Sequence, residues 1–220
     1  MNFTLADGFA WLVILFVAIT AAAAYFLGCF NGAVIVSKYI LRDDVRTHGS
    51  GNAGLTNFFR TFGGPLTFVV ILTDVLKAVL AVLVGTWLLG GLFGPEFGKY
   101  WAGLFCLIGH MFPCMFGFKG GKGILSGGTI AFMLDWRLAV LAWGGFLLLT
   151  ILTRYVSLGS IYAAASFPVG TWLFVSHDPV IMTLALIIAA LILWKHRANF
   201  MRLIRGQESK LTFRKKKEGV

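Results

Sequence analysis

The stretch PLTFVVILTDVLKAVLAVLVGTWLLG, residues 65–90, decides the fold class of this chain. Its only charged residues are Asp74 and Lys77, and the remainder is predominantly apolar. Because a helix that crosses a bilayer needs about 20 consecutive apolar residues, the stretch predicts a transmembrane helix. Asp74 and Lys77 lie one helical turn apart within it, and we interpret them as a paired structural contact. The alternative is a catalytic role.

The composition of the whole chain indicates a membrane protein. The 220 residues are 58% hydrophobic and 13% charged, with a mean hydropathy of +0.84, whereas soluble proteins carry about 25% charged residues. This length accommodates several spanning helices and leaves little for a soluble domain. We therefore predict a single integral membrane domain over residues 1–220, with a basic cytoplasmic tail at about 200–220. Asp7 precedes the first apolar run in place of basic residues, so we expect no cleavable signal peptide.

The remaining apolar runs extend this prediction to an all-α polytopic membrane protein with seven transmembrane helices. The runs lie at about 9–40, 65–90, 100–116, 123–134, 137–153, 156–175 and 179–195. Lysine and arginine concentrate in alternate connections between them, namely 38–60, 119–122, 154 and the segment from 195 onward. Because cytoplasmic loops are enriched in these residues, we predict that the N-terminus lies outside and the C-terminus in the cytoplasm.

Three polar segments on the predicted cytoplasmic side each precede a helix that runs outward. They are residues 48–60, 117–123 and 154–157. A helix N-terminus carries unpaired N–H groups and the positive end of the helix dipole. Three such termini at one face favour the binding of a phosphate group.

The first polar segment, HGSGNAGLTN at residues 48–57, is followed by Arg60. It matches the pattern GxGxxG, but no strand precedes it, so a dinucleotide site is not indicated. Glycines interspersed with Ser, Asn and Thr can form a nest of N–H groups that binds an anion. The alternative is a flexible turn between two spans.

The second polar segment contains Lys119-Gly120-Gly121-Lys122-Gly123. It is not a nucleotide-binding P-loop, because Gly123 stands where a Ser or Thr would hold magnesium. Two lysines in a glycine turn at the start of a helix suit an oxyanion ligand. The alternative is a cationic anchor on the cytoplasmic side.

Two further groups of polar residues have helical spacing. Arg154, Ser157 and Ser160 share one helix face, as do His196 and Asn199. For the serines, hydrogen bonds within the membrane helices are the alternative. His110, at the inner end of the third run, is as well suited to bracing a loop as to catalysis.

Several catalytic patterns are missing from the chain. No histidine begins an HxxxxD motif, no GxSxG elbow is present, and Asp43 and Asp44 are the only acids on the predicted cytoplasmic side before the tail. These are too few for a metal-dependent phosphotransferase, so we expect neither a metal nor a cofactor. Cys29, Cys106 and Cys114 are predicted as packed side chains without a disulfide or zinc. No nucleic-acid-binding module is recognisable, so the basic tail is expected to contact anionic lipid.

Four ordered motifs resemble those of a known family, the acyl-phosphate-dependent glycerol-3-phosphate acyltransferases, or PlsY family. Its patterns are SGNxGATN followed by Arg, GHxxPxFxxFKGGKG, RYxSLxS and a closing HRxN. Here they stand at Ser50–Asn57 with Arg60, Gly109–Gly123, Arg154–Ser160 and His196–Asn199. Four motifs in this order are highly specific.

The resemblance implies transfer of a fatty acyl group from acyl phosphate to the sn-1 hydroxyl of glycerol 3-phosphate, which yields lysophosphatidic acid. It also implies a multi-pass protein of the bacterial inner membrane, with the site facing the cytoplasm, where a soluble enzyme that produces acyl phosphate is an expected partner. Residues expected to contact the phosphates are Ser50, Arg60, Lys119, Lys122, Ser157, His196 and Asn199. We assign catalysis to Ser50, Arg60, Lys119, Ser157 and His196. We assign substrate binding to Gly49, Gly51, Asn52, Gly54, Thr56, Asn57, Gly120, Gly121, Lys122, Arg154, Ser160 and Asn199.

Some positions depart from the family pattern. Ala53 stands where proline is usual, Leu55 where alanine is, Ala198 where an acid often follows, and Cys29-Phe30-Asn31 where Ser-Ile-Pro is usual. These departures bear on efficiency and acyl-chain preference more than on the reaction. The leaving phosphate is the favoured proton acceptor, with His196 or His110 as the alternative. The alternative function is a membrane carrier for phosphate or sugar-phosphate anions.

Overall fold

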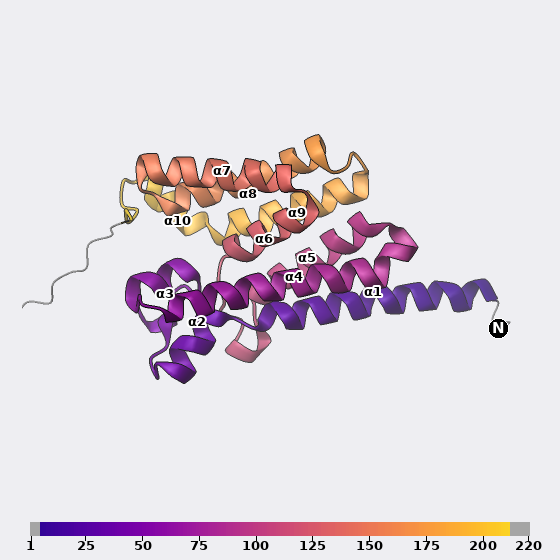
Figure 1. The fold of residues 1–220 in the computed structure, drawn as a ribbon, viewed down its shortest axis with the longest axis horizontal. Helices are drawn as coiled ribbons and strands as arrows, with labels where there is room; N and C mark the ends of the chain where they lie inside the picture. Colours follow the sequence, from indigo (N-terminus) through magenta and orange to yellow (C-terminus); the bar gives the residue numbers. More distant parts are fainter. Residues whose placement is uncertain (1–4, 212–220) are drawn as a thin grey trace, which may run out of the picture.

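The computed structural model describes residues 5–211, which form helices and connecting loops without any strand. Seven long helices pack side by side (Figure 1) and follow the seven predicted apolar runs closely. They are α1 (Leu5–Cys29), α4 (Leu66–Phe93), α5 (Pro95–Met111), α6 (Ile124–Leu134), α7 (Trp136–Thr153), α8 (Val156–Phe174) and α9 (Pro179–Lys195). The all-α prediction is therefore confirmed.

Not every long helix has the length and hydropathy of a typical span. In the described part of the chain, three segments do: Asp7–Ile40, Leu66–Phe93 and Trp136–Thr153. A fourth is obtained if α9 and α10 (Arg197–Ile204), which meet at a bend of 57°, count as one span. The count of seven spans and the sides of the two termini stay predictions.

The first apolar run is not one helix, as residues 9–40 had suggested. It breaks at Phe30 and Asn31, where α1 ends and the short α2 (Gly32–Ile35) begins, followed by the π-helical turn η1 (Val36–Ile40). The Asn31 side chain accepts a hydrogen bond from the Val34 N–H at 3.0 Å and so caps α2. An asparagine cap at this point starts a new helix, a local signal that hydrophobicity alone does not reveal.

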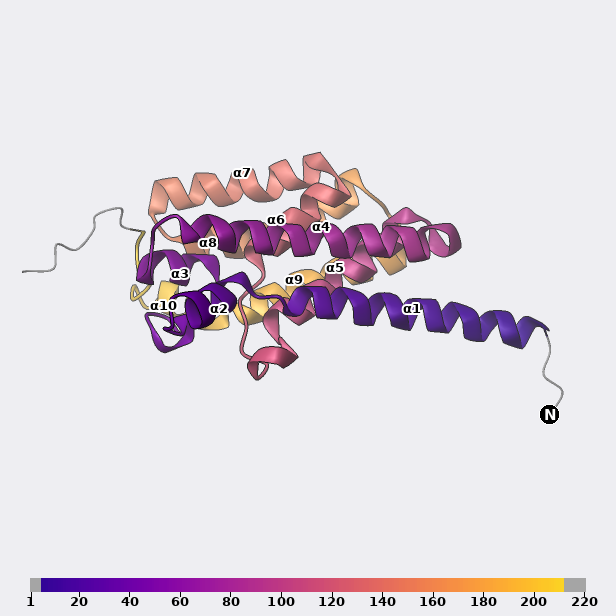
Figure 2. The ribbon, with the colours of Figure 1, turned by 60° about the horizontal axis from the view of Figure 1, so that its bottom comes forward.

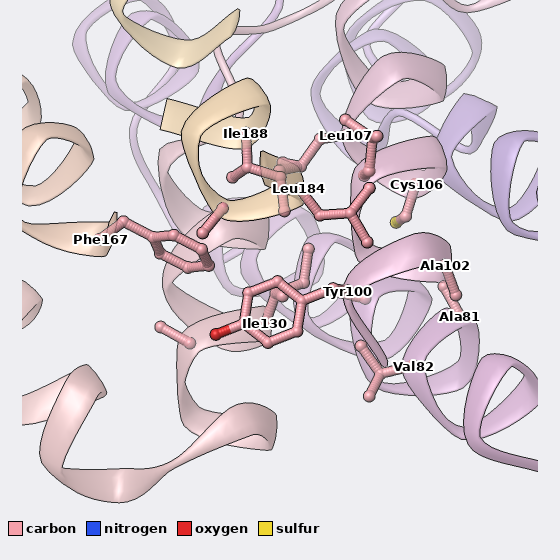
Figure 3. Close-up of a cluster of buried hydrophobic side chains, with 14 of the residues drawn as sticks. Ala81, Val82, Tyr100, Ala102, Cys106, Leu107, Ile130, Phe167, Leu184 and Ile188 are labelled. Carbon is pink, nitrogen blue, oxygen red and sulfur yellow. The ribbon is translucent and has the colours of Figure 1, made fainter. Parts of the chain in front are cut away.

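Close packing of small residues brings α4 and α5 together near the connection between them. Gly85 of α4 and Gly98 of α5 face one another so closely that a Cβ on either would overlap the other's carbonyl oxygen. Small residues at such crossings are typical of membrane helices, which gain stability from van der Waals contact. Figure 3 shows the adjoining core, in which the Tyr100 ring lies near Phe167 and Ile130. The Tyr100 hydroxyl also forms a hydrogen bond with Thr171 Oγ1 at 2.8 Å, joining α5 to α8.

The outer surface of the long helices is apolar. Trp87 on α4 is 81% exposed, and Ile151 and Leu152 on α7 are 73% and 71% exposed. A contiguous surface of this kind indicates contact with lipid. The core and the surface therefore both agree with an integral membrane protein.

The polar segments gather at one end of the bundle, opposite the end where α1 begins (Figures 1 and 2). This end carries α2, α3 (Leu55–Thr61), α10 and two 3-10 turns, η2 (Val45–Thr47) and, slightly further in, η3 (Cys114–Phe116). The segment 48–60 was expected to be a loop leading directly into the second span. The last part of the segment instead belongs to the seven-residue helix α3, which precedes α4.

Candidate functional site

Lys122 lies at the centre of the polar end. Its ammonium group donates a hydrogen bond to Asn199 Oδ1 on α10. The Asn199 amide in turn donates to Glu208 Oε1 at 2.8 Å, and Arg202 Nε donates to Glu208 Oε2 at 2.7 Å. Lys122 precedes α6, whereas Asn199, Arg202 and Glu208 come from the end of the described chain. The tail thus closes over the second polar segment.

The charges of this cluster affect one another. Burial, together with the nearby cations Arg202, Lys195 and Arg60, lowers the pKa of Lys122 to about 8, while Glu208 acts in the opposite direction. Burial acts to raise the pKa of Glu208, but hydrogen bonds from Asn199 and Arg202 hold it below its usual value. An excess of cations remains around Lys122, which favours an anionic ligand.

Two further predicted residues border the cluster with unused polar groups. Ser157, in the first turn of α8, is buried and its Oγ has no hydrogen-bond partner, although the group lies near enough to Glu208 to help lower the pKa of that carboxyl. His196 is buried at the junction of α9 and α10, and its Nδ1 lies 2.8 Å from the Ile192 carbonyl oxygen. A carbonyl can only accept, so Nδ1 carries the proton and Nε2 is left as an acceptor. Both groups can serve a substrate.

The third polar segment contributes only one of its three predicted residues to the Lys122 cluster. Ser160 Oγ donates to the Val156 carbonyl at 2.9 Å, the intrahelical bond that was the alternative for this residue. Arg154 has a left-handed backbone with φ of 63° and an exposed side chain, and its carbonyl accepts from the Leu211 N–H at 2.7 Å. The structure therefore brings Ser157 to the cluster, and gives Ser160 and Arg154 bonds within the protein.

The first polar segment is organised around Asn57. Its Oδ1 accepts from the Ser50 N–H at 3.0 Å, and its Nδ2 donates to the Val45 and His48 carbonyls at 3.0 Å each. The amide is thus occupied in bracing the loop. Gly49 and Gly51 have φ of 55° and 67°, the left-handed region that glycine tolerates best.

The other predicted residues of this segment surround that brace. The Ser50 side chain is exposed. The Asn52 amide lies against Gly54, close to where a Cβ would stand. Thr56 lies in the first turn of α3, which begins at Leu55.

The second polar segment passes close to α5 and to the first segment. Gly120 and Gly121 donate from their backbone N–H groups to the Met111 and His110 carbonyls at 3.3 and 3.1 Å. A Cβ at Gly121 would overlap His110 Nε2 and would stand 2.8 Å from the Ala53 carbonyl oxygen. Only glycine allows this approach, so the two predicted binding loops meet at Gly121.

Two predicted cations, Arg60 and Lys119, lie at the margin of the cluster and not within it. Both side chains are exposed. Arg60 Nη2 donates to the Ser209 carbonyl at 3.4 Å, which places it beside the returning tail. Arg60 stands in the last turn of α3 and Lys119 in the second polar segment, and both side chains reach the surface.

Sequence reasoning missed four residues that hold these segments in place. Arg46 pairs with Asp44 at 2.7 Å and donates to the Phe116 carbonyl at 2.7 Å, which ties the first segment to η3. Lys195 donates to the Met111 carbonyl at 3.2 Å. Arg202 donates to Glu208, which holds the tail over the second polar segment. An acid at position 208 within a strongly basic tail was the only available signal.

A small apolar pocket lies between α6, α7, α8 and α9. Its lining includes Ile124, Gly128, Trp143, Ala164, Phe167 and Ile192. Ile124 follows Lys122 by two positions, and Ile192 is the residue whose carbonyl faces His196. The polar cluster and the pocket therefore share three helices.

Comparison with known proteins agrees with these features. Residues 18–206 match the family model described as glycerol-3-phosphate acyltransferase. The glycerol-3-phosphate acyltransferase of Thermoanaerobacter pseudethanolicus is 38% identical over 197 residues, covering 90% of this chain and 96% of the relative. That of Trichlorobacter lovleyi is 40% identical over 190 residues, covering 86% and 94%.

Solved structures support the same assignment. The crystal structure of PlsY (YgiH), an integral membrane glycerol 3-phosphate acyltransferase, in its glycerol 3-phosphate form matches with a TM-score of 0.80 and 31% identity, covering 89% of this chain and 96% of that chain. The lysophosphatidic acid form of the same protein matches with a TM-score of 0.76. The agreement of sequence, motifs and fold over nearly the whole length shows that this chain belongs to the glycerol-3-phosphate acyltransferase family.

Proposed function

We propose that the chain acylates the sn-1 hydroxyl of glycerol 3-phosphate with acyl phosphate as donor, and that the reaction takes place at the Lys122 cluster. Family membership makes the chain an acyltransferase that forms lysophosphatidic acid. The observation that carries the location is the half-buried Lys122–Asn199 contact, which lies among the cations Arg202, Lys195 and Arg60 beside the start of α6. Such an arrangement suits two phosphate-bearing substrates.

The reaction needs positioning more than covalent chemistry. The hydroxyl oxygen of glycerol 3-phosphate attacks the acyl carbonyl carbon, the bond from that carbon to the phosphate oxygen breaks, and the departing phosphate takes the hydroxyl proton. Lys122 and the N-terminal ends of α6 and α8 hold the phosphates and stabilise the oxyanion, and Ser157 and His196 Nε2 complete the contacts. Orientation of two bound substrates contributes up to about 7–11 kcal/mol in favourable cases.

The acyl chain of the donor extends into the apolar pocket between α6 and α9. Ala164 lies two helical turns beyond Ser157 on the same face of α8, and Ile192 lies one turn before His196 on α9. A chain whose carboxyl end is held at the cluster therefore meets apolar side chains directly. Small residues, namely Gly127, Ala131 and Ala164, line this pocket.

The membrane arrangement belongs to the same proposal. Seven spans, an outside N-terminus and a cytoplasmic C-terminus place the Lys122 cluster at the cytoplasmic face of the inner membrane, where a soluble enzyme delivers acyl phosphate. Alternation of cations along the sequence supports this orientation. Part of the predicted basic tail, residues 212–220, lies outside the described residues. Membrane-impermeant thiol labelling of His177→Cys and Gln207→Cys, in a variant without native cysteines, tests it. Labelling of position 207 from outside would contradict it.

Two assays of the same purified protein, one in detergent and one in sealed vesicles, distinguish acyl transfer from transport by a carrier. Purified protein in detergent, given glycerol 3-phosphate and acyl phosphate, is expected to form lysophosphatidic acid, because transfer needs no sealed compartment. The same protein in sealed vesicles is expected to accumulate no labelled glycerol 3-phosphate or phosphate. Uptake into vesicles without product in detergent would overturn the proposed function in favour of a carrier.

A further inference from the structure

A buried cluster of ionisable side chains lies beneath the two binding loops. Lys77 and Asp74 of α4 form an ion pair at 2.6 Å, and His110 of α5 lies beside them, with its Nδ1 at 2.7 Å from Lys77 Nζ. The three residues are 2–3% exposed. The pairing predicted for Asp74 and Lys77 is thus confirmed, with His110 as an unforeseen third member.

The Lys77 ammonium group has close contacts with three neighbours. Besides the ion pair with Asp74 and the hydrogen bond with His110, Nζ donates to the Phe30 carbonyl at 3.1 Å. An ammonium group has three donors and no acceptor, so His110 Nδ1 is the acceptor of its bond with Lys77. Lys77 therefore joins α4 to the break after α1 and to the last turn of α5.

Phe30 and His110 each lead to one of the two binding loops. Phe30 does so through the next residue, Asn31, and His110 through its own backbone carbonyl. Next to Phe30, Asn31 Nδ2 donates to the Ala53 carbonyl at 3.0 Å in the first loop. The His110 carbonyl accepts from the Gly121 N–H at 3.1 Å in the second loop. The two loops meet where Ala53 approaches Gly121, so both sides of that contact lead back to Lys77.

We propose that Lys77 is a positioning residue for acyl transfer, which sets the first binding loop against the second through Asn31 and His110. Stability alone is a poor explanation for the ion pair, because a buried pair is often matched or exceeded in stability by apolar residues of similar size. Charged groups inside membrane segments are also costly to insert. The inference rests on the proposed function, because it assigns substrate binding to both loops.

The test replaces both charges together, because Lys77→Met alone would leave Asp74 unpaired. The double variant Asp74→Leu with Lys77→Met is expected to retain the thermal unfolding temperature of the wild type in detergent. Its kcat/KM for glycerol 3-phosphate is expected to fall at least tenfold, since a displacement of about 1 Å in a site costs on the order of 100-fold. Lys77→Arg, which keeps a charged donor, is expected to recover part of the activity that Lys77→Met loses.

The matched control is Tyr100→Phe, which removes a buried hydrogen bond between α5 and α8 that leads to neither loop. It is expected to lower the unfolding temperature without changing kcat or KM. A double variant with wild-type kinetics would overturn the inference, as would one that fails to fold, since the pair would then serve stability. Wild-type protein that forms no lysophosphatidic acid would instead overturn the proposed function, independently of Lys77.

Discussion

A single lysine carries much of the chemistry assigned to the polar end. Lys122 is half-buried, its ammonium group contacts Asn199, and its nearest charged neighbours are mostly cations. Holding a cation there works against stability unless an anion joins the group. The excess of cations around Lys122 is therefore the feature that supports the proposed phosphate-binding site.

Removal of the Lys122 charge should affect the reaction directly. Lys122→Met is expected to lower kcat/KM on the order of 100-fold, the size typical of losing one stabilising group at a developing oxyanion. Lys38→Met, at an exposed lysine at the same end of the bundle, is the control and should leave the kinetics unchanged. Steady-state kinetics of purified proteins at equal folded concentration decide the matter. Similar kinetics in both variants would mean that Lys122 is only a cytoplasmic anchor.

The lowered pKa of Lys122 predicts a pH dependence. The side chain is charged below its pKa and neutral above it, so kcat/KM should fall as the pH rises through about 8. Lys122→Arg keeps its charge at every accessible pH and should flatten this limb of the profile. The measurement is a pH profile of kcat/KM with both proteins. A wild-type profile that rises across this range would contradict the charge state assigned to Lys122.

Sequence motifs identified most of the residues at the cluster, but not which of them keep polar groups free for a ligand and which form hydrogen bonds within the protein. Ser157, His196 and Asn199 were identified because they stand in the RYxSLxS and HRxN motifs. Ser160 forms the intrahelical bond that was its alternative, whereas the bond from Asn57 to its own loop depends on loop geometry that the motif does not encode. Glu208 was missed because it acts through a return of the chain after α10, which only the tertiary fold creates.

At the scale of helices and loops, glycines decide how closely the loops approach. Gly121→Ala would place a Cβ against His110 Nε2 and near the Ala53 carbonyl, so the second loop must shift. We expect a large rise in KM for glycerol 3-phosphate, measured by initial rates. Gly144→Ala on α7 is the control, because no atom lies within 4 Å of the added Cβ. Equal KM values in the two variants would show that the approach at Gly121 is not needed for binding.

The acyl chain of the donor is proposed to lie between α6, α7, α8 and α9, so a substitution that narrows this space should change the preferred acyl-chain length. Ala164→Leu fills part of the pocket, so the preferred acyl phosphate should become shorter, by an amount that reflects roughly 0.8 kcal/mol per buried methylene. Ala165→Leu, the adjacent exposed position, makes the same chemical change on the outer face of α8 and should keep the wild-type preference. Competition between acyl phosphates of different length measures this. An unchanged profile in Ala164→Leu would remove the acyl chain from this pocket.

Long helices could be predicted from the sequence, and short ones could not. Each of the seven long helices corresponds to an apolar run, because hydrophobicity in a membrane protein directly reports the segments that avoid water. The helices α2, α3 and α10 are four, seven and eight residues long. Isolated helices of this length are not stable alone, so tertiary contacts determine them.

At the scale of the whole molecule, the bundle separates an apolar body from one polar end. The charges that the sequence distributed over distant segments meet at that end, where α6 and α8 begin and α10 folds over them (Figure 1). This arrangement offers cations and N–H groups to a phosphate. Within residues 5–211, no recognisable catalytic dyad lies at this end to activate a poorer acyl donor.

The most direct test of this account is the choice of donor by the purified protein. With glycerol 3-phosphate as acceptor, product analysis should show lysophosphatidic acid from acyl phosphate, at a rate that is unchanged by EDTA, and little or none from acyl-CoA. In the proposed reaction the leaving phosphate binds at the Lys122 cluster and accepts the proton, and a thioester donor has no leaving phosphate to do either. Lysophosphatidic acid formed equally fast from acyl-CoA, or only when a metal ion is added, would contradict the account.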